Sequence, residues 1–566
     1  MKYLHHETGT IKKEWGGKLP VLLVYPDTYR AGMSNLAVHT VYKTLNELDN
    51  VVCERCFWRK GEKDPVSIES KRGVNDFSVI ALSVSFETDY INVVDFIKSS
   101  HLELYAYKRT YGPLIIAGGI AVTLNPEPIA EFMDLCVIGE AEGVVEDIMD
   151  IIQKGINSGK DKTSILHELD ELEGVYVPLF YNIKYGSNSQ IEAIEHAFKK
   201  GKKVKRHIAP ELNHASSTTI YTNNTTFSGM HLQEVSRGCN YRCRFCISGY
   251  AYLPPRHRHI EWLKRDLNVL PETVKRVGIV SPMVTDYPYL KELLDYIHSL
   301  GLKASMSSMH VNALMKFDLN KLDISTDQFS AAIAPEAGTY RLRRILNKDL
   351  RDEHIFSAVR FLIKHKIKTL KLYFLIGIPT ETDEDIKAIG KLILEIKGII
   401  KSEHGRIQVS INPLIPKPFT PLQWIGLITP QEVKNRLRLI QEMLRSSDVL
   451  IEWERYYLLQ GILSRGDRRL SKFLVYLSEA NRAINQAIKT SGIDIDYYAF
   501  RSRTKDEILP WDFIDYGFKK DFLFTEYKLG MKGIFTPPCN PASCNICGIC
   551  HTFHTPEMSS SKRIND

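Results

Sequence analysis

The stretch RGCNYRCRFC, residues 237–246, places three cysteines close together in the chain: Cys239, Cys243 and Cys246. Thiolates are soft ligands that suit iron–sulfur clusters. Three of them can hold three corners of a four-iron cube and leave the fourth iron without a protein ligand. The spacing therefore predicts a cluster with an open iron, to which a reactant can bind.

A zinc knuckle is the alternative interpretation of this triplet. A closed zinc site needs four ligands, and the nearest later candidates, His257 and His259, lie beyond Pro254 and Pro255. The triplet also follows an apparent strand at 231–236 and opens the first loop in a series of strand and helix units. Barrel enzymes carry their catalytic residues on such loops, so the position favours a catalytic cluster.

With Phe245 directly before the last cysteine, the run resembles the signature of the radical S-adenosylmethionine (SAM) superfamily. The resemblance implies that the open iron chelates the amino and carboxylate groups of the cofactor's methionine, and that reductive cleavage yields a 5′-deoxyadenosyl radical. It assigns Cys239, Cys243 and Cys246 as cluster ligands and catalytic residues. It also assigns Phe245 as a cofactor contact.

Composition and charge set the class of protein. The chain has 566 residues, which suggests three or four domains, and its 44% hydrophobic and 25% charged residues are typical of a soluble globular protein. No run of about 18 uncharged apolar residues is present, and residues 1–9 do not form a signal peptide, so we expect a cytoplasmic protein that does not bind a membrane. Seven of the ten cysteines lie in two tight groups, which favours reduced metal sites over a disulfide framework.

The net charge of +7 permits an anionic partner without requiring one. The densest basic run, KKGKKVKR at 199–206, is interpreted as a solvated linker, and a contact with nucleic acid is the alternative. The whole segment 161–230 is predicted to be a linker between two domains.

Residues 18–160 show the pattern of a doubly wound, flavodoxin-like α/β domain. Short apolar strands alternate with amphipathic helices, and a parallel sheet of this kind binds its ligand beyond the carboxyl ends of its strands. The predicted strands are 21–25, 51–57, 79–85, 114–117 and 135–138, and helices are predicted at 36–48 and from 91. The loops that follow the strands, 26–35, 83–90, 118–123 and 139–143, are therefore the expected ligand site.

Two of these loops, in IIAGGIAVTLNPEP and VIGEAEG, resemble the cobalamin-binding domain that precedes the radical domain in many such enzymes. The resemblance implies that the corrin is held by Gly118, Gly119, Thr123, Gly139 and Glu140. The Asp-x-His-x-x-Gly element that supplies a histidine ligand in other B12 proteins is missing. We therefore expect cobalamin to bind base-off, with no histidine beneath the cobalt. A flavodoxin-like domain without a cofactor is the alternative.

A second cysteine pair, Cys53 and Cys56, lies in a predicted strand. A Cys-x-x-Cys pair can indicate redox or zinc chemistry. Residues three apart on a strand point to opposite faces, so we interpret this pair as incidental.

Residues 231–423 are predicted to form a partial (β/α)6 barrel, which carries the radical SAM chemistry. Its six expected strands are 231–236, 274–280, 303–307, 329–334, 369–376 and 408–412. By resemblance, Glu336 contacts the adenosyl or methionine part of SAM, and the loop 280–287 borders the site. The strand-end segments 334–339 and 377–382 have the small and polar residues that cofactor recognition at a strand end requires.

Residues 424–535 are predicted to be a helical C-terminal domain, and residues 536–555 a metal-binding tail. The tail contains Cys539, Cys544, Cys547 and Cys550 in the spacing C-x4-C-x2-C-x2-C. Four closely spaced thiols indicate a metal knot, either a structural zinc or a second iron–sulfur cluster, and ligand softness favours the cluster. The chain from about 20 to 550 resembles an incompletely characterised family of radical SAM enzymes with a B12-binding domain.

The leading functional hypothesis is a cobalamin-dependent radical SAM methyltransferase that works anaerobically. It uses a [4Fe-4S] cluster, SAM and cobalamin, and it acts at an unactivated carbon of a protein side chain or a tRNA. A flavodoxin or ferredoxin is the expected electron donor. The alternatives are a methylthiotransferase or cyclase that uses an auxiliary cluster in the tail, and a noncatalytic iron–sulfur or RNA-binding protein.

Overall fold

The computed structural model describes residues 6–209, 211–212, 216–306, 311, 330–364, 368–400, 406–447, 449–540, 544 and 546–549. Its N-terminal half is built on a six-stranded sheet with the order β3-β2-β4-β5-β6-β7, which we call the first sheet. Neighbouring strands run parallel except for the edge pair β6 and β7. Leaving out β7, this is the strand order of a flavodoxin-like doubly wound sheet, as predicted. The strands are β2 (Leu19–Tyr25), β3 (Val51–Phe57), β4 (Val79–Ser83), β5 (Leu114–Gly118), β6 (Leu135–Val137) and β7 (Val175–Tyr176).

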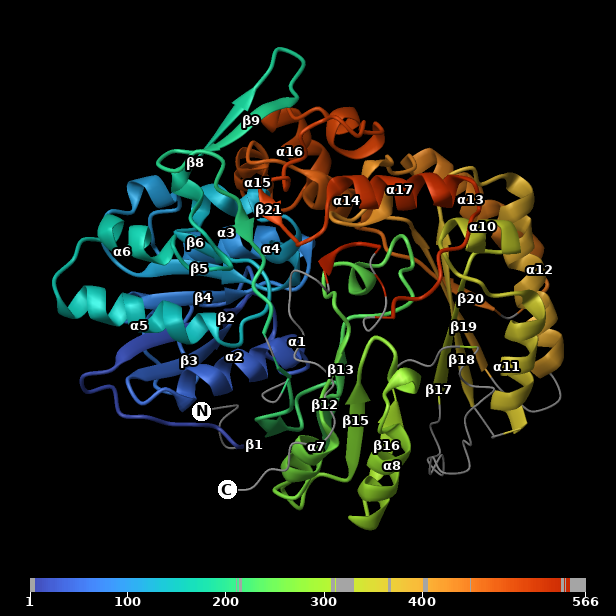
Figure 1. The fold of residues 1–566 in the computed structure, drawn as a ribbon, viewed down its shortest axis with the longest axis horizontal. Coiled ribbons are helices and arrows are strands. Elements are labelled where there is room, and N and C mark those ends of the chain that lie inside the picture. The colour runs from blue at the N-terminus through green and yellow to red at the C-terminus, as the bar shows by residue number, and fades with distance from the viewer. Residues whose placement is uncertain are drawn as a thin grey trace.

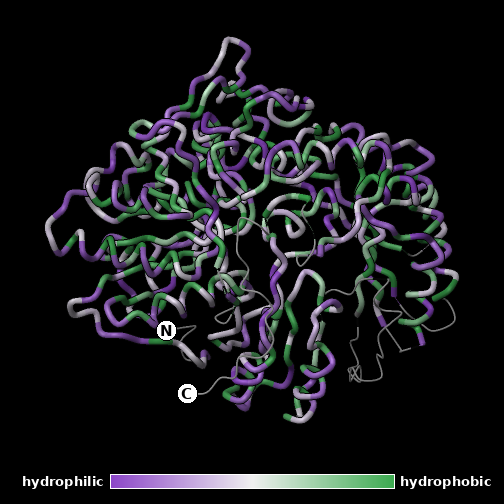
Figure 2. The backbone as a smooth tube through the Cα atoms, in the orientation of Figure 1, coloured by the Kyte–Doolittle hydropathy of each residue, from purple (hydrophilic) through white to green (hydrophobic). Residues whose placement is uncertain are grey.

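The first sheet forms because its strands are nearly continuous apolar runs, which only a sheet covered on both faces can bury. Hydrophobic residues follow these strands through the interior of this half (Figure 2). Helices lie on both sides of the sheet, on the left of Figure 1. They are α1 (Tyr29–Gly32), α2 (Leu36–Glu47), α3 (Tyr90–Ser99), α4 (Ile120–Leu124), α5 (Val144–Asn157) and α6 (Lys162–Leu169).

The segment 161–230 is not the simple linker that the sequence suggests. It supplies α6 and the edge strand β7, whose two residues are fully buried, and then a projecting hairpin, β8 (Tyr181–Tyr185) and β9 (Ile191–His196) (Figure 1). Two further short strands attach it elsewhere: β10 (Val204–Lys205) pairs with β21 (Ile514–Asp515), and β11 (Tyr221–Thr222) pairs with β1 (Glu7–Thr8). Strands of two residues have no periodicity, so the sequence pattern does not reveal them.

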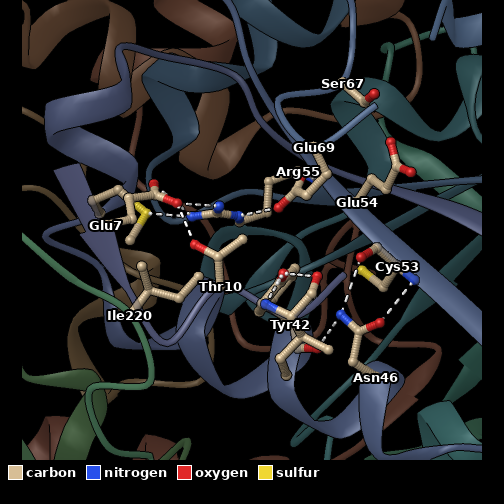
Figure 3. Close-up of polar contacts among 12 residues, drawn as sticks. Glu7, Thr10, Tyr42, Asn46, Cys53, Glu54, Arg55, Ser67, Glu69 and Ile220 are labelled. Carbon is tan, nitrogen blue, oxygen red and sulfur yellow. Dashed lines mark hydrogen bonds and ion pairs between the residues drawn. The ribbon is translucent and has the colours of Figure 1, made fainter. Parts of the chain in front are cut away.

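The N-terminal segment is fixed to the first sheet by a buried arginine (Figure 3). Arg55 on β3 has no exposed surface and donates to Glu7 at 2.7 Å and to Glu69 at 2.6 Å. Two carboxylates therefore neutralise one buried guanidinium, as a buried charge requires. Cys53, also labelled in Figure 3, lies on the same strand and exchanges backbone hydrogen bonds with the Asn46 side chain.

The second half of the chain contains the predicted parallel strands in two sheets. The first consists of β12 (Met230–Glu234), β15 (Arg276–Val280) and β16 (Lys303–Met306), and the second of β17 (Ser330–Glu336), β18 (Thr369–Ile376), β19 (Arg406–Pro413) and β20 (Leu450–Glu452). All six predicted strands are present, and the short seventh strand β20 was not predicted. Helices follow the strands on the outside: α7 (Ile260–Leu267), α8 (Leu290–Ser299), α10 (Tyr340–Ile345), α11 (Asp352–Lys364), α12 (Asp383–Ile400) and α13 (Pro430–Leu444) (Figure 1).

The C-terminal helices bridge the two halves along the top of Figure 1. They are α14 (Tyr457–Arg465), α15 (Leu470–Glu479), α16 (Ile484–Ser491) and α17 (Lys520–Met531). Buried side chains of α14 and α15 belong to the same hydrophobic core as the first sheet, and α15 packs against α3. Within the described residues, no helix is both long and apolar enough to cross a membrane.

Candidate active site at the cysteine loop

The three cysteines of the predicted cluster lie on a closed loop, residues 238–255, which we call the cysteine loop. It is closed by a short antiparallel pair, β13 (Ser236–Arg237) and β14 (Arg256–His257). Cys239, Cys243 and Cys246 are all partly exposed, and the Cys246 amide donates to the Cys243 carbonyl at 2.9 Å. Burial raises the pKa of the Cys239 and Cys243 thiols to about 12. Both are protonated at neutral pH in the metal-free chain, so a metal that binds there must displace protons.

Two buried arginines hold the cysteine loop in place. Arg206 donates to the carbonyls of Ala251 and, at 2.7 Å, of Leu253. Arg244, within the loop, donates to the Ile345 carbonyl at 3.1 Å and forms a 3.3 Å ion pair with Glu526 of α17. The loop is therefore braced from both the first half and the C-terminal helices.

Arg206 is the last residue of the basic run 199–206, and other residues of that run form ion pairs with acidic residues. Lys202 pairs with the buried Asp170, and Lys205 pairs with Glu173 at 2.8 Å. Lys199 pairs with Glu171. The acidic residues just before β7 thus neutralise much of the run, a pairing between distant segments that the local sequence does not indicate.

The predicted SAM contacts lie at the carboxyl ends of β17, β18 and β19. Phe245 packs against an apolar cluster that includes Ile378 and Leu414, which follow β18 and β19. Glu336 ends β17 at a register shift, with a left-handed φ of 67°, and pairs with Lys348 at 2.9 Å. This is the edge of a parallel sheet at which α/β enzymes bind ligands. Lys348 was not predicted from the sequence.

A cavity of about 530 Å³ separates the first sheet from the cysteine loop. One wall is the carboxyl edge of the first sheet, and the other includes Arg237 and Gly238, directly before Cys239. Small, apolar and hydroxyl side chains dominate its lining, and none of the described residues that line it is a histidine. Pockets of this size and polarity suit a large organic cofactor, and the described lining residues offer no imidazole for a metal at its centre. Cobalamin without a histidine ligand fits this donor set.

The five predicted corrin contacts have different roles in the structure. Gly118, Gly119, Gly139 and Glu140 line the cavity. Thr123 is buried instead, and its hydroxyl accepts a hydrogen bond from the Gly139 amide at 3.1 Å. Thr123 therefore positions a cavity loop and does not face the cavity.

Gly139 is also required by the fold itself. Its φ is 118°, and a Cβ at this position would lie 2.2 Å from the His207 carbonyl oxygen. A side chain is excluded by both the backbone conformation and the close contact. Gly139 therefore lets the cavity loop pass close to the backbone of His207, in addition to leaving space for a ligand in the cavity.

Glu140 is an ion-pair partner of the cysteine loop. Its carboxylate forms ion pairs with Arg237, at 2.9 Å, and with Arg256, and it accepts from the Ala209 amide at 3.0 Å. Burial alone would raise the pKa of Glu140, but the arginines lower it to about 2. Both oxygens form these ion pairs, so Glu140 joins the cavity loop to the cysteine loop, and its contact with a corrin stays a prediction.

The tail cysteines lie against the cysteine loop. The Cys539 amide donates to the Asn240 carbonyl at 2.8 Å, and Arg242 donates to the Cys544 sulfur at 3.2 Å. Burial would raise the pKa of the Cys544 thiol, but hydrogen bonds from the Ile546 amide and Arg242 lower it. Cys550 lies outside the described residues. Among the residues that the structure describes, no three His, Cys, Asp or Glu side chains are grouped closely enough to hold a single metal ion.

The other cysteine pair, Cys53 and Cys56, lies on β3 in the first sheet and not on the cysteine loop. Cys53 and Cys56 are both buried on β3, each only 1% exposed. Burial raises the pKa of Cys56 to about 12 and also raises the pKa of Cys53. Such thiols behave as small apolar core residues.

Comparison with known proteins gives the following similarities. A family described as radical SAM proteins, N-terminal, matches residues 37–178, and the radical SAM superfamily matches residues 234–393. An uncharacterized protein of Methanocaldococcus jannaschii is 31% identical over 481 residues, which cover 84% of this chain and 95% of that protein. The threonylcarbamoyladenosine tRNA methylthiotransferase MtaB of Aquifex aeolicus is 24% identical over 37% of this chain and 52% of its own length. The solved radical SAM methyltransferase TsrM of Kitasatospora setae is 14% identical with a TM-score of 0.45, over 72% of this chain and 75% of that one.

Proposed function

Since the chain belongs to the radical SAM superfamily of enzymes, we propose that it is a cobalamin-dependent methyltransferase acting at an unactivated carbon. The observation that carries this proposal is the cavity between the first sheet and the cysteine loop. Ligands of doubly wound sheets bind at the carboxyl edge. A cofactor in this cavity would therefore face the segment that enters the cysteine loop, and two cofactors would act on one substrate.

The roles of the residues follow from their places. We assign the four-iron cluster to Cys239, Cys243 and Cys246, whose loop is held rigidly, and SAM to the strand ends near Phe245 and Glu336. The corrin is assigned to the loops that line the cavity. When bound, the cluster supplies the electron that cleaves SAM, and cobalamin supplies the methyl group. The protein binds and orients these groups and excludes water from the radical.

We propose a macromolecule, a protein or a tRNA, as the substrate, and a flavodoxin or ferredoxin as the electron donor. The Aquifex relative is named a tRNA methylthiotransferase, which favours a macromolecular substrate. The basic helix α10 is a weaker argument than its sequence suggests. Arg341 pairs with Asp385, Arg343 with Asp352 and Arg344 with Asp349, so its charges are largely neutralised.

Methylthio transfer is the second candidate. The observation in its favour is that the tail cysteines lie against the cysteine loop, where a second cluster would be close to the radical. The two candidates differ in their product, because a methylthio group adds sulfur and a methyl group does not. Mass spectrometry of RNA and protein from a deletion strain would identify the missing modification and separate them.

The cobalamin proposal can be tested by partly filling the cavity. Gly118 lines it, and a Cβ there meets only the Val137 side chain at 3.7 Å, an ordinary contact. Gly118→Leu should therefore fold and lose hydroxocobalamin that the wild-type protein retains after anaerobic loading. Gly16→Leu is the control, because a Cβ at Gly16 meets no atom within 4 Å.

Retained cobalamin should show a base-off spectrum without histidine coupling in the cob(II) state. Methyl transfer is then followed with SAM labelled in its methyl group. If the wild-type protein retains no cobalamin, or Gly118→Leu binds as much as Gly16→Leu, the cavity is not the corrin site and the proposal fails.

A further inference from the structure

Arg242 is a buried cation within the cysteine loop that the proposed chemistry does not yet use. It lies directly before Cys243, has no exposed surface, and adopts a left-handed φ of 51°. A non-glycine residue holds such a conformation only where its surroundings require it. The backbone conformation of the loop therefore determines where the Arg242 side chain lies.

The guanidinium of Arg242 has incomplete hydrogen bonding. One nitrogen, Nη2, donates to the Cys544 sulfur at 3.2 Å. Nε and Nη1 are buried and have no hydrogen-bond partner in the described part of the chain. The Cys539 thiol is the other sulfur that interacts with the guanidinium, and among the described residues no carboxylate forms an ion pair with it. The Phe522 ring lies 5.8 Å from the guanidinium carbon and offers only a weak cation–π contact.

A buried guanidinium with incomplete hydrogen bonding lowers the stability of the folded protein. A buried donor without a partner costs about 1–3 kcal/mol, and a buried charge without a counter-charge costs more. Unsatisfied buried donors in a native structure need an explanation, and an ion or ligand that binds beside them is one. An anionic acceptor beside Cys539 and Cys544 would supply both the charge and the hydrogen bonds that this guanidinium lacks.

The tail is held in a fixed register beside this guanidinium. The Cys539 amide donates to the Asn240 carbonyl at 2.8 Å. The Asn347 side chain donates to the Tyr241 carbonyl at 3.1 Å and accepts from the Thr536 amide at 2.8 Å. These bonds join the two residues before Arg242 to the start of the tail, so Cys539 lies against the cysteine loop.

We propose that Arg242 joins the two cysteine sites by donating its free N–H groups to the sulfur atoms of a metal centre gathered by the tail. Metal-bound thiolates, and the sulfides of an iron–sulfur cluster, are anionic acceptors that supply both the charge and the hydrogen bonds that Arg242 lacks. Metal binding at the tail then fixes the loop between Cys239 and Cys243. The inference rests on the proposed tail metal site and is independent of methyl transfer.

The planar fork of arginine is essential to this role. It presents several N–H groups in fixed directions, whereas lysine offers one compact charge. Arg242→Lys should therefore keep part of the attraction for the tail centre, and Arg242→Met should lose it. Arg344 is a matched control, because it donates to the Gly533 carbonyl at 3.1 Å and contacts the same C-terminal segment without reaching a cysteine.

The experiment measures the tail metal alone, in a chain whose Cys239, Cys243 and Cys246 are replaced by alanine. The metal present after anaerobic purification is identified, and its affinity is measured by competition with a chelator. Arg242→Met should lower that affinity at least tenfold and Arg242→Lys by less, while Arg344→Met should leave it unchanged. A folded Arg242→Met chain with the parent affinity, or a parent chain that binds no metal, would overturn the inference.

A second measurement needs no Arg242 variant. Hydrogen exchange is compared in the same parent chain with the tail metal bound and after its removal. Loss of protection should appear both in tail peptides and in peptides that cover 238–246, because Arg242 transmits the change. A change confined to the tail would contradict the link. A chain that fails to transfer methyl groups would disprove the proposed function and leave both measurements unaffected.

Discussion

Arg237 and Glu140 form an ion pair of 2.9 Å that joins the cavity loop after β6 to the residue before the cysteine loop. Arg237 also pairs with Glu234 at 2.7 Å and with Glu142 at 2.8 Å. The residue that enters the cysteine loop is therefore held by carboxylates from both halves of the protein. A ligand in the cavity and a cluster on the loop would share this wall.

Replacing Glu140 with glutamine should destabilise the fold by about 3 kcal/mol at neutral pH, because the buried Arg237 and the partly buried Arg256 lose a shared counter-charge. The pKa of Glu140 is about 2 in the folded chain and 4.5 in the reference state. A lowered pKa stabilises the fold fully above pH 4.5, and that contribution is lost as pH falls toward 2. The free-energy difference between parent and variant should therefore shrink as pH falls below 4.5.

Urea unfolding of the two chains from pH 7 to pH 3 measures this difference. The parent should lack Cys239, Cys243 and Cys246, so that loss of a cluster in acid does not contribute. Asp150→Asn is the control, since Asp150 pairs with Lys154 on an exposed helix face and should change stability by less than about 0.5 kcal/mol. A pH-independent Glu140→Gln effect would rule out the ionic role.

Replacing Arg206 with methionine should loosen the cysteine loop. The side chain is buried and its charged donors hold two loop carbonyls, so the loss should cost about 3 kcal/mol and reduce the iron retained on the loop. Lys200→Met, in the same basic run but exposed, should change neither quantity. Equal effects of the two substitutions on stability and iron content would show that the run acts only through its charge.

The sequence predicts the elements of this fold well because each long strand is an apolar run of its own. Strands β2, β3, β5 and β18 lie within about two residues of their predicted bounds. The short edge strand β7 and strand β20 were missed, since strands this short carry no measurable period. Glycine and cysteine patterns likewise located the cavity loops and the cysteine loop.

The sequence could not predict how charged residues pair across the fold. The resemblance identified Glu140 as a site residue, but its ion-pair partners Arg237 and Arg256 are more than ninety positions away in the sequence. Arg206 belongs to a run that the sequence suggests is a solvated linker, and the sequence gives no indication of a role for Arg242. The role of a buried arginine depends on the carbonyls and carboxylates that it contacts. These groups are far apart in the sequence, and only the three-dimensional structure shows that they are neighbours.

Substituting Cys239, Cys243 and Cys246 with alanine should abolish the formation of 5′-deoxyadenosine from SAM. These thiols are the ligands assigned to the cluster, and an iron without protein ligands is lost from the loop. The product is measured by chromatography after anaerobic reduction. Cys53→Ala is the control, because its buried thiol lies on β3 away from the loop and the variant should retain cleavage. Normal cleavage by the triple variant would show that the radical site lies elsewhere.

The same triple variant should still bind metal through Cys539, Cys544, Cys547 and Cys550. Close thiols at the end of a chain gain a defined structure when an ion gathers them, and here Asn240 and Arg242 already hold the first two in place. Elemental analysis after anaerobic purification distinguishes the possibilities: about four irons per chain identify an auxiliary cluster, and about one zinc identifies a structural site. Cys544→Ser in this background should reduce the metal content, because it removes a ligand in contact with Arg242. A parent chain with neither metal would exclude the tail site.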